Sequence, residues 1–136
     1  MLREDGGVMD DGTTTRISEN HYHMTTTTAQ AANVLSHLEY YLQVVWPNLK
    51  VNVVSTTEQW AGAAVAGPNS RSLLSKLFPN IDVSNEALPF MGYVEGDLFG
   101  VKARIFRISF SGELAYEMNV ESGYGNFMCE KIIELG

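Results

Sequence analysis

The sequence predicts an α+β fold in which three helices pack on a mixed or antiparallel sheet. Three observations predict it: short β-branched runs between turn residues, apolar residues at helical spacing in three places, and a two-residue alternation near the end of the chain. The expected order is β-β-α-β-β-α-β-β-β-α, without internal repeats. With 136 residues, 45% of them hydrophobic, the chain can build one modest core, so we expect one domain.

The first third of the chain is expected to form a hairpin and an amphipathic helix. Residues 13–17 and 22–27 are β-branched and aromatic runs, and residues 18–20 between them are turn material. After Thr28, which can serve as an N-cap, apolar residues recur at helical spacing until Pro47 ends the pattern. These apolar positions are Val34, Leu35, Leu38, Tyr41, Leu42 and Val45.

Two strands and a second helix are expected in the middle of the chain. Residues 51–54 and 60–66 have strand character, and the second run consists largely of small residues that allow a neighbouring element to pack closely. Residues 67–71 lack the glycine-rich loop or following lysine of a phosphate site, so we interpret them as a strand-to-helix turn with Pro68 in the first helical turn. Residues 78–80 end this helix, whose buried stripe is expected to be Leu73, Leu74 and Leu77.

The last part of the chain is predicted to contain three strands, over residues 90–95, 101–109 and 113–120, and a helix from Asn126. Alternation in the third strand puts Leu114, Tyr116, Met118 and Val120 on one face and Glu113, Ala115, Glu117 and Asn119 on the other. The second face carries two carboxylates and is therefore the candidate for binding a ligand.

Charge and composition exclude several classes of partner. A net charge of −7 with only nine Lys and Arg residues argues against nucleic acid, which is bound through basic side chains. No apolar run approaches the ~20 residues that cross a bilayer, and charged residues stand at positions 3–5, so we expect a soluble, cytoplasmic protein without a membrane partner. Cys129 is the only cysteine, and we expect it to be a buried small side chain in the last helix.

Histidine and tryptophan offer weaker candidates. His21 and His23 would share one strand face but lack a third ligand, so no metal site is expected. Trp46 and Trp60 stand next to helix and strand ends, where aromatic residues usually pack the core, and we assign Trp60 to the core. No G-x-G-x-x-G segment exists, so flavin or dinucleotide binding is not expected in this chain.

Two pairs of carboxylates could carry chemistry. Asp10 and Asp11 follow paired glycines and precede Gly12, and Glu113 and Glu117 fall on one predicted strand face. Carboxylates on rigid structure accept hydrogen bonds from a ligand rich in N–H donors, and one held next to a reactive nitrogen could move protons. On an extended backbone only one of Asp10 and Asp11 would point into a cleft. From the residues alone, Asp10-Asp11-Gly12 is more typical of an Asp-Gly turn, and Glu113 and Glu117 are more typical of a solvated strand face.

Three blocks make the chain resemble the folate-binding aminomethyltransferase family, which includes the glycine-cleavage T-protein. They are Gly-Gly-Val-Met-Asp-Asp-Gly at residues 6–12, Gly-Pro-Asn-Ser-Arg at residues 67–71, and Arg-Ile-Ser-Phe-Ser-Gly-Glu-Leu-Ala-Tyr-Glu at residues 107–117. Phe110 replaces a tyrosine of many T-proteins and Thr27 replaces a common asparagine. With these changes the sequence is most similar to the α subunit branch of heterotetrameric sarcosine oxidase.

The resemblance implies a T-protein-like folate-binding fold and a set of site residues. By its place in the Gly-Gly-x-x-Asp-Asp block, Asp11 would be the catalytic carboxylate beside the folate nitrogens. By its place in the Gly-Glu-x-x-Tyr-Glu pattern, Glu117 would bind the pterin. The further folate-binding residues that we expect are Asp10, Glu113, Phe110 and Tyr116.

The resemblance also implies tetrahydrofolate as cofactor and other sarcosine oxidase subunits as partners, with flavin and NAD only in other segments or subunits. The implied reaction transfers the imine from sarcosine oxidation to tetrahydrofolate, giving 5,10-methylenetetrahydrofolate and glycine. A flavin-independent aminomethyltransferase and a non-catalytic fragment of the fold are the alternatives, and a dimethylglycine pathway stays open. Relatives carry a segment before the Gly-Gly block and a domain after the last helix, so residues 1–136 are expected to be a partial domain, inactive alone and able to self-associate.

Overall fold

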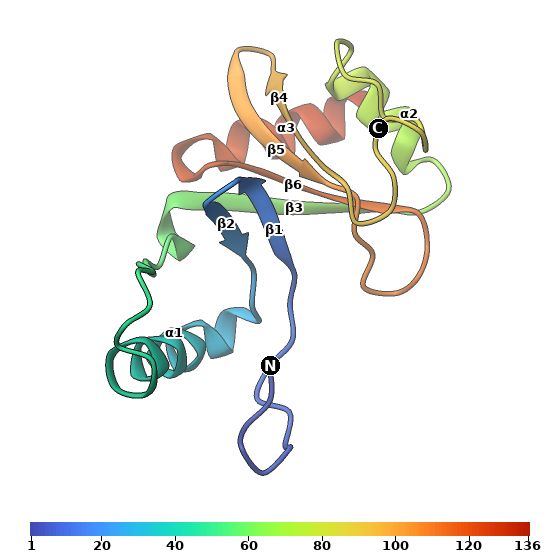
Figure 1. Cartoon of the computed structure of the whole chain (residues 1–136). Coiled ribbons are helices and arrows are strands. Elements are labelled where there is room, and N and C mark those ends of the chain that lie inside the picture. Colours follow the sequence, from blue (N-terminus) through green and yellow to red (C-terminus); the bar gives the residue numbers. More distant parts are fainter. The chain divides into compact units, whose positions relative to one another are not determined.

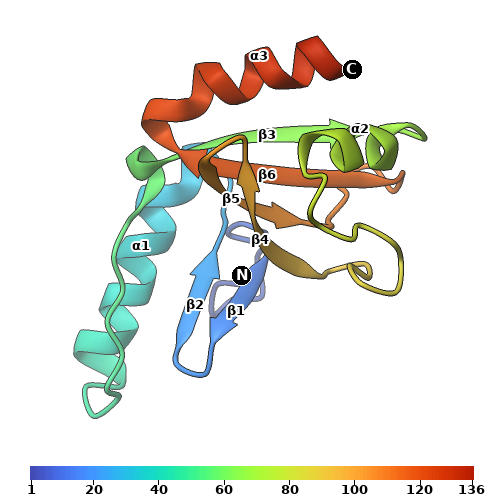
Figure 2. The same cartoon turned by 90° about the horizontal axis from the view of Figure 1, so that it is seen from above.

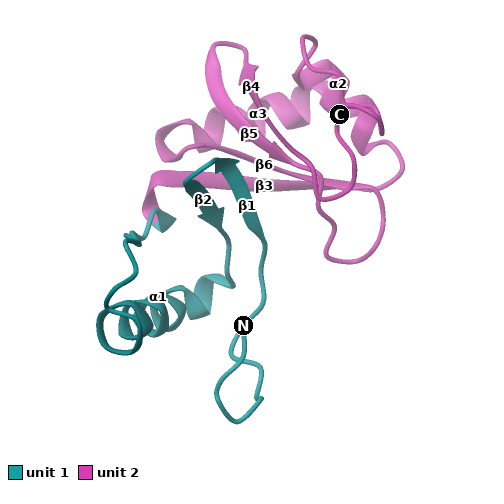
Figure 3. Ribbon diagram, viewed as in Figure 1, with its two compact units in different colours: residues 1–57 teal, residues 58–136 magenta.

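The computed structural model describes residues 1–136 and divides them into two compact units, residues 1–57 and 58–136 (Figures 1 and 3). Each unit has its own antiparallel sheet, and three α-helices complete the chain. The predicted α+β class is therefore confirmed. None of the helices combines the length and the apolar character that spanning a membrane requires.

The first unit contains the predicted hairpin and helix. Strands β1 (Thr14–Ser18) and β2 (His21–Met24) pair antiparallel, with a register irregularity next to the turn. A 3-10 turn, η1 (Thr28–Gln30), leads into α1 (Ala31–Tyr40), and the helix ends in a π-helical turn, η2 (Tyr41–Val45). The predicted helical pattern before Pro47 thus combines three kinds of helix, and its one fully buried side chain is Val34.

The predicted strand over residues 51–54 is wrong. These residues pair with no other strand, and the side chains of Val51 and Val54 are more than half exposed. A β-branched run becomes a strand only where its backbone finds a partner and its side chains find a surface to cover. Neither is present here, so the order that the structure has is β-β-α-β-α-β-β-β-α.

The second unit is built on a four-stranded antiparallel sheet in the order β3-β6-β5-β4 (Figure 1). Its strands are β3 (Trp60–Ala66), β4 (Tyr93–Leu98), β5 (Val101–Phe106) and β6 (Ala115–Glu121). The four strands are those predicted, with shifted ends. β4 starts three residues later than expected because a tight turn, in which the Gly92 N–H donates to the Pro89 carbonyl, occupies the preceding residues.

Helices α2 (Ser70–Leu77) and α3 (Gly125–Leu135) lie on one face of this sheet (Figure 2). The predicted turn between β3 and α2 is confirmed: Gly67 has a φ of 116°, which favours glycine, and its N–H donates to the Leu114 carbonyl at 2.8 Å. The hydrophobic core between the helices and the sheet consists of Leu74, Leu77, Phe78, Val83, Leu88, Leu98, Ala103, Ile105, Tyr116, Met118, Val120 and Met128.

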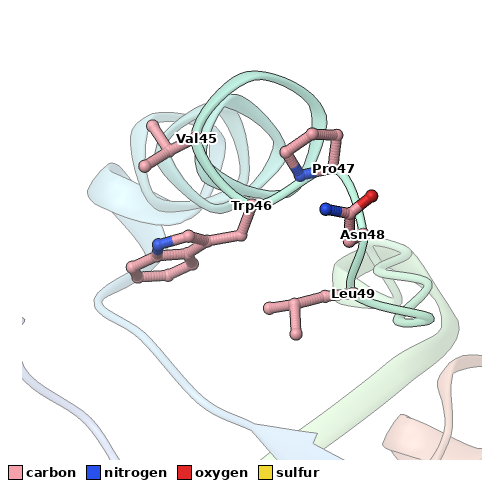
Figure 4. A pocket seen from close by; sticks show the side chains of 5 residues that line it. All are labelled: Val45, Trp46, Pro47, Asn48 and Leu49. Carbon is pink, nitrogen blue, oxygen red and sulfur yellow. The ribbon is translucent and has the colours of Figure 1, made fainter.

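Two predicted core positions, Cys129 and Trp60, are corrected. Cys129 is exposed, because its neighbour Met128 faces the core and adjacent helical positions point about 100° apart. Trp60 is only partly buried, since its register in β3 puts it on the sheet face away from the helices. Trp46 is half exposed and lines a surface hollow of about 500 Å³ after η2 (Figure 4).

Candidate functional site

Glu117 lies in the middle of β6, on the sheet face opposite α2 and α3. Its sequence neighbours Tyr116 and Met118 are fully buried in the core, so strand alternation directs Glu117 to the other face. Its cross-strand neighbours are Ala64 in β3 and Phe106 in β5. Glu117 is half-buried, and burial raises the pKa of its carboxyl group above the ordinary value.

The Glu117 carboxylate has no protein partner: no hydrogen bond and no ion pair of the chain involves it. Next to it, the rings of Phe106 and Tyr93 lie with their centroids 5.1 Å apart, and Ala64 supplies a small side chain on the other flank. This part of the sheet therefore combines an unpartnered, partly desolvated acceptor with aromatic and small side chains. Such a surface suits a flat ligand with N–H donors on its edge.

Arg104 contributes a second charged group to the same face. It stands opposite Glu95 in β4 and Asn119 in β6, and its Nε lies 3.6 Å from Glu95 Oε1. Its guanidinium carbon lies 4.0 Å from the ring centroid of Trp60. The sequence analysis missed this group, because Arg104 and Glu95 are recognisable as neighbours only when the register of β4 against β5 is known.

The loop between β5 and β6 carries two of the predicted folate-binding residues. The prediction that Glu113 shares a strand face with Glu117 is wrong: β6 begins at Ala115, and Glu113 lies exposed in the loop, where it accepts a hydrogen bond from Ser111 Oγ at 2.7 Å. Gly112, with a φ of 92°, turns the chain just before it. Phe110 is fully exposed in this loop.

Tyr116 lies on the core side of β6. It is completely buried, and the Arg71 Nε–H donates to its hydroxyl oxygen at 3.1 Å. The same guanidinium donates to Asn85 Oδ1 at 2.6 Å, which ties α2 to the loop before β4. Because neighbouring residues of a strand point to opposite faces, the structure does not bring Tyr116 together with the Glu117 carboxylate.

In the first unit, Asp10 and Asp11 have opposite environments. Asp10 is 7% exposed and accepts two hydrogen bonds from Thr27, from the backbone N–H at 2.9 Å and from Oγ1 at 2.6 Å. These hydrogen bonds hold the pKa of Asp10 below its ordinary value. Asp11 is exposed and its carboxylate has no partner within the chain, as the alternation of an extended backbone predicts.

The Asp-Gly turn that the residues alone could have formed is not present. Residues 10–13 continue the antiparallel course of the hairpin beside residues 25–27, where the Thr25 N–H donates to the Thr13 carbonyl at 2.9 Å. A Cβ on Gly12 would lie 1.9 Å from the Thr25 carbonyl oxygen, so only glycine fits this approach. Asp10 thus fastens the segment, while the carboxylate of Asp11 stays available for a ligand.

The predicted histidine pair lies in β2, with His21 exposed and His23 partly buried. No group of three or more His, Cys, Asp or Glu side chains is arranged to hold a metal ion. The hollow after η2 contains none of the predicted site residues, and Asn48 is the single polar side chain among its lining residues (Figure 4). The two carboxylate blocks, one in each unit, are therefore the groups that could bind a ligand.

The chain is similar to known proteins along its whole length. A family model described as "GCVT N-terminal domain" matches residues 1–136. The chain is 51% identical to a sarcosine oxidase subunit alpha of Rhizobium meliloti (strain 1021) and 48% identical to one of Corynebacterium sp. (strain P-1). It is 31% identical to an aminomethyltransferase of Listeria monocytogenes serotype 4a (strain HCC23).

Each of these alignments covers the whole chain but only part of the relative. The chain spans 14% of the length of the two sarcosine oxidase subunits and 36% of the length of the aminomethyltransferase. The resemblance predicted from the three sequence blocks is confirmed.

Proposed function

This chain belongs to the GCVT N-terminal domain family, and from that premise we propose that it is a tetrahydrofolate-binding part of a sarcosine oxidase α-type subunit. The observation that carries the proposal is the Glu117 carboxylate, which is fixed on a strand, half-buried, and without a partner in the chain. The identity of 51% to a sarcosine oxidase subunit, against 31% to an aminomethyltransferase, favours this branch of the family.

In this proposal Glu117 binds the pterin through the N–H and amino donors at the edge of its ring. A carboxylate accepts such hydrogen bonds more strongly than a neutral group does, and it can bind two donors at once. The partly buried Tyr93 would support the ring face, and Phe106, which is buried beside it, would hold the Tyr93 ring in place.

Asp11 is the proposed catalytic residue. When bound, tetrahydrofolate supplies the nitrogens N5 and N10 that take up the one-carbon unit. An exposed carboxylate without an internal partner can hold or move a proton at such a nitrogen. Asp10 would act indirectly by fixing the backbone of Asp11 through its hydrogen bonds to Thr27.

The remaining proposed folate-binding residues fall into two groups. Phe110 and Glu113 lie on the exposed loop before β6 and would contact the ligand from there. Tyr116 would contribute by anchoring β6, since its buried hydroxyl is bound by Arg71. The proposed residues thus comprise side chains that touch folate, namely Glu117, Asp11, Phe110 and Glu113, and side chains that hold them in position.

The proposed reaction combines the imine from sarcosine oxidation with tetrahydrofolate and yields 5,10-methylenetetrahydrofolate and glycine. Oxidation would take place at a flavin held by another segment or subunit, so the other sarcosine oxidase subunits are the proposed partners. Much of the rate gain would come from aligning two bound reactants, which can supply on the order of 7 to 11 kcal/mol in ideal cases.

Calorimetric titration with 5-formyltetrahydrofolate tests the proposal. Glu117→Gln is expected to raise the Kd about 10- to 100-fold, because a hydrogen bond to a charged group contributes about 1.5–3 kcal/mol. Glu121→Gln is the matched control, since Glu121 lies on the same face at the exposed end of β6. Asp11→Asn should weaken binding less than Glu117→Gln. Equal affinities for the wild type and Glu117→Gln would contradict the assigned role.

A flavin-independent aminomethyltransferase is the second candidate, and the 31% identity to such an enzyme is the observation in its favour. One-carbon transfer from an aminomethyl donor to folate in the absence of flavin subunits would support it over the first. A non-catalytic role predicts instead an unfolding midpoint that stays constant across folate concentrations, because only a ligand that binds the folded state raises it.

A further inference from the structure

A cationic side chain, that of Arg104, lies near Glu117 but forms no ion pair with it. In the register of β5 and β6, Phe106 lies opposite Glu117 and Arg104 lies opposite Asn119, so Arg104 is the diagonal neighbour of Glu117. Diagonal neighbours on an antiparallel pair lie about 7–8 Å apart, which a long side chain can bridge. No ion pair joins Arg104 to Glu117, however, and burial alone raises the pKa of Glu117.

Arg104 is held on the opposite side by its neighbours. Its Nε lies 3.6 Å from Glu95 Oε1, and its guanidinium carbon lies 4.0 Å from the Trp60 ring centroid. Glu95 is itself fixed, because it accepts a hydrogen bond from the hydroxyl group of Tyr93. The Arg104 side chain is 16% exposed, whereas that of Glu95 is 61% exposed, so solvent screens the pair from the Glu95 side.

The hold on Arg104 is incomplete. Its Nε is buried and makes no hydrogen bond, since 3.6 Å to Glu95 is beyond hydrogen-bond distance. A guanidinium with an unused donor would gain from a second carboxylate, and Glu117 and Glu121 are the two carboxylates of β6 that lie diagonal to Arg104 on this face. The other charged groups further along β4 and β5 on this face are Asp97 and Lys102, which stand opposite each other in register, and β3 contributes none.

We propose that Glu95 is a positioning residue for Glu117: by holding Arg104 it keeps the guanidinium away from Glu117 and leaves that carboxylate free to bind a ligand. An Arg104–Glu117 pair would occupy the acceptor sites that the N–H donors of the ligand need. The part of this inference that concerns folate rests on the proposed function, whereas the positioning of Arg104 does not.

The first test measures the Glu117 pKa by carboxyl carbon NMR in four proteins: wild type, Glu95→Gln, Arg104→Gln and the double variant. In Glu95→Gln the released guanidinium is expected to pair with Glu117 and to lower its pKa by about 1 to 3 pH units, as an adjacent Arg does for a carboxylate. Loss of the Glu95 charge also lowers this pKa directly, but that contribution persists in the Arg104→Gln background. The proposal therefore requires a much smaller decrease in that background.

Two controls separate positioning from general damage to the fold. Glu95→Asp keeps the negative charge and should retain the wild-type pKa of Glu117, and the unfolding midpoints of all variants should be compared. An equal decrease of the Glu117 pKa in both Arg104 backgrounds, or no decrease in Glu95→Gln, would overturn the positioning role.

The second test measures the affinity for 5-formyltetrahydrofolate in the same four proteins. Glu95→Gln is expected to weaken binding about tenfold, and adding Arg104→Gln should restore it, because no guanidinium is then left to occupy Glu117. If wild-type protein bound no folate while the NMR cycle still showed the coupling, the proposed function would fail and the positioning of Arg104 would stand. Unchanged affinity in Glu95→Gln, with a lowered Glu117 pKa, would refute the claim that positioning serves the ligand.

Discussion

The two carboxylates that lie furthest from solvent in their units, Asp10 and Glu117, differ in what surrounds them. Asp10 has two hydrogen bonds from Thr27, and its pKa is lowered. Glu117 has no partner, and its pKa is raised by burial. The first carboxylate is tied to the chain that carries it, whereas burial of the second is not offset by any partner in the chain. A carboxylate kept without a partner on rigid structure is the one available to a ligand.

The largest expected effect tests how firmly the Asp10 segment is fixed. Gly12→Ala would place a methyl group 1.9 Å from the Thr25 carbonyl oxygen, so the strands of the hairpin stem must move apart. We expect a loss of about 1–3 kcal/mol in the free energy of unfolding, the usual cost of overpacking. Denaturant titration measures it, and Gly123→Ala is the control because a Cβ there meets no atom within 4 Å. A neutral Gly12→Ala would show that Asp10 and Thr27 do not depend on this close approach.

The pH dependence of stability should have opposite signs for the two carboxylates. Asp10 has a lowered pKa in the folded state, so its contribution is present above the unfolded pKa and is lost as the pH falls through the folded pKa. Glu117 has a raised folded pKa, so its cost is present above that value and disappears as the pH falls toward the unfolded pKa.

Chemical denaturation of Asp10→Asn and Glu117→Gln across pH 3–7 therefore separates the two roles. Asp10→Asn should lower the free energy of unfolding at neutral pH and make it depend less on pH in the acid range. Glu117→Gln should raise the stability at neutral pH, with less gain in acid. Asp11→Asn is the matched control, since its carboxylate is exposed and unpaired. Parallel curves for Asp10→Asn and Glu117→Gln would remove the distinction between a structural and an available carboxylate.

The same contrast shows what the sequence can and cannot predict. The alternation from Leu114 to Val120 correctly predicted that Tyr116, Met118 and Val120 are buried, because a strand with one face on a core repeats with a period of two, but it did not predict that Ala115 is buried as well. It could not predict that β6 starts after Glu113, nor that residues 51–54 find no partner strand. The sequence also could not predict that Arg104 pairs with Glu95. That pairing depends on the register of β4 against β5, which is set by the turn between the two strands and by their packing on the rest of the sheet.

The smallest expected effect concerns the loop before β6 and tests whether exposure marks availability there as well. Phe110 is fully exposed and packs on nothing, so Phe110→Ala should change the free energy of unfolding by no more than about 0.5 kcal/mol. If its ring contacts folate, the same substitution should weaken binding severalfold, because an aromatic contact contributes about 0.5–1.5 kcal/mol. Measuring the free energy of unfolding and the folate affinity of this one variant thus distinguishes a ligand-binding residue from a surface residue without a role in binding. Unchanged affinity would leave Glu117 as the folate contact of this unit and remove Phe110 from the site.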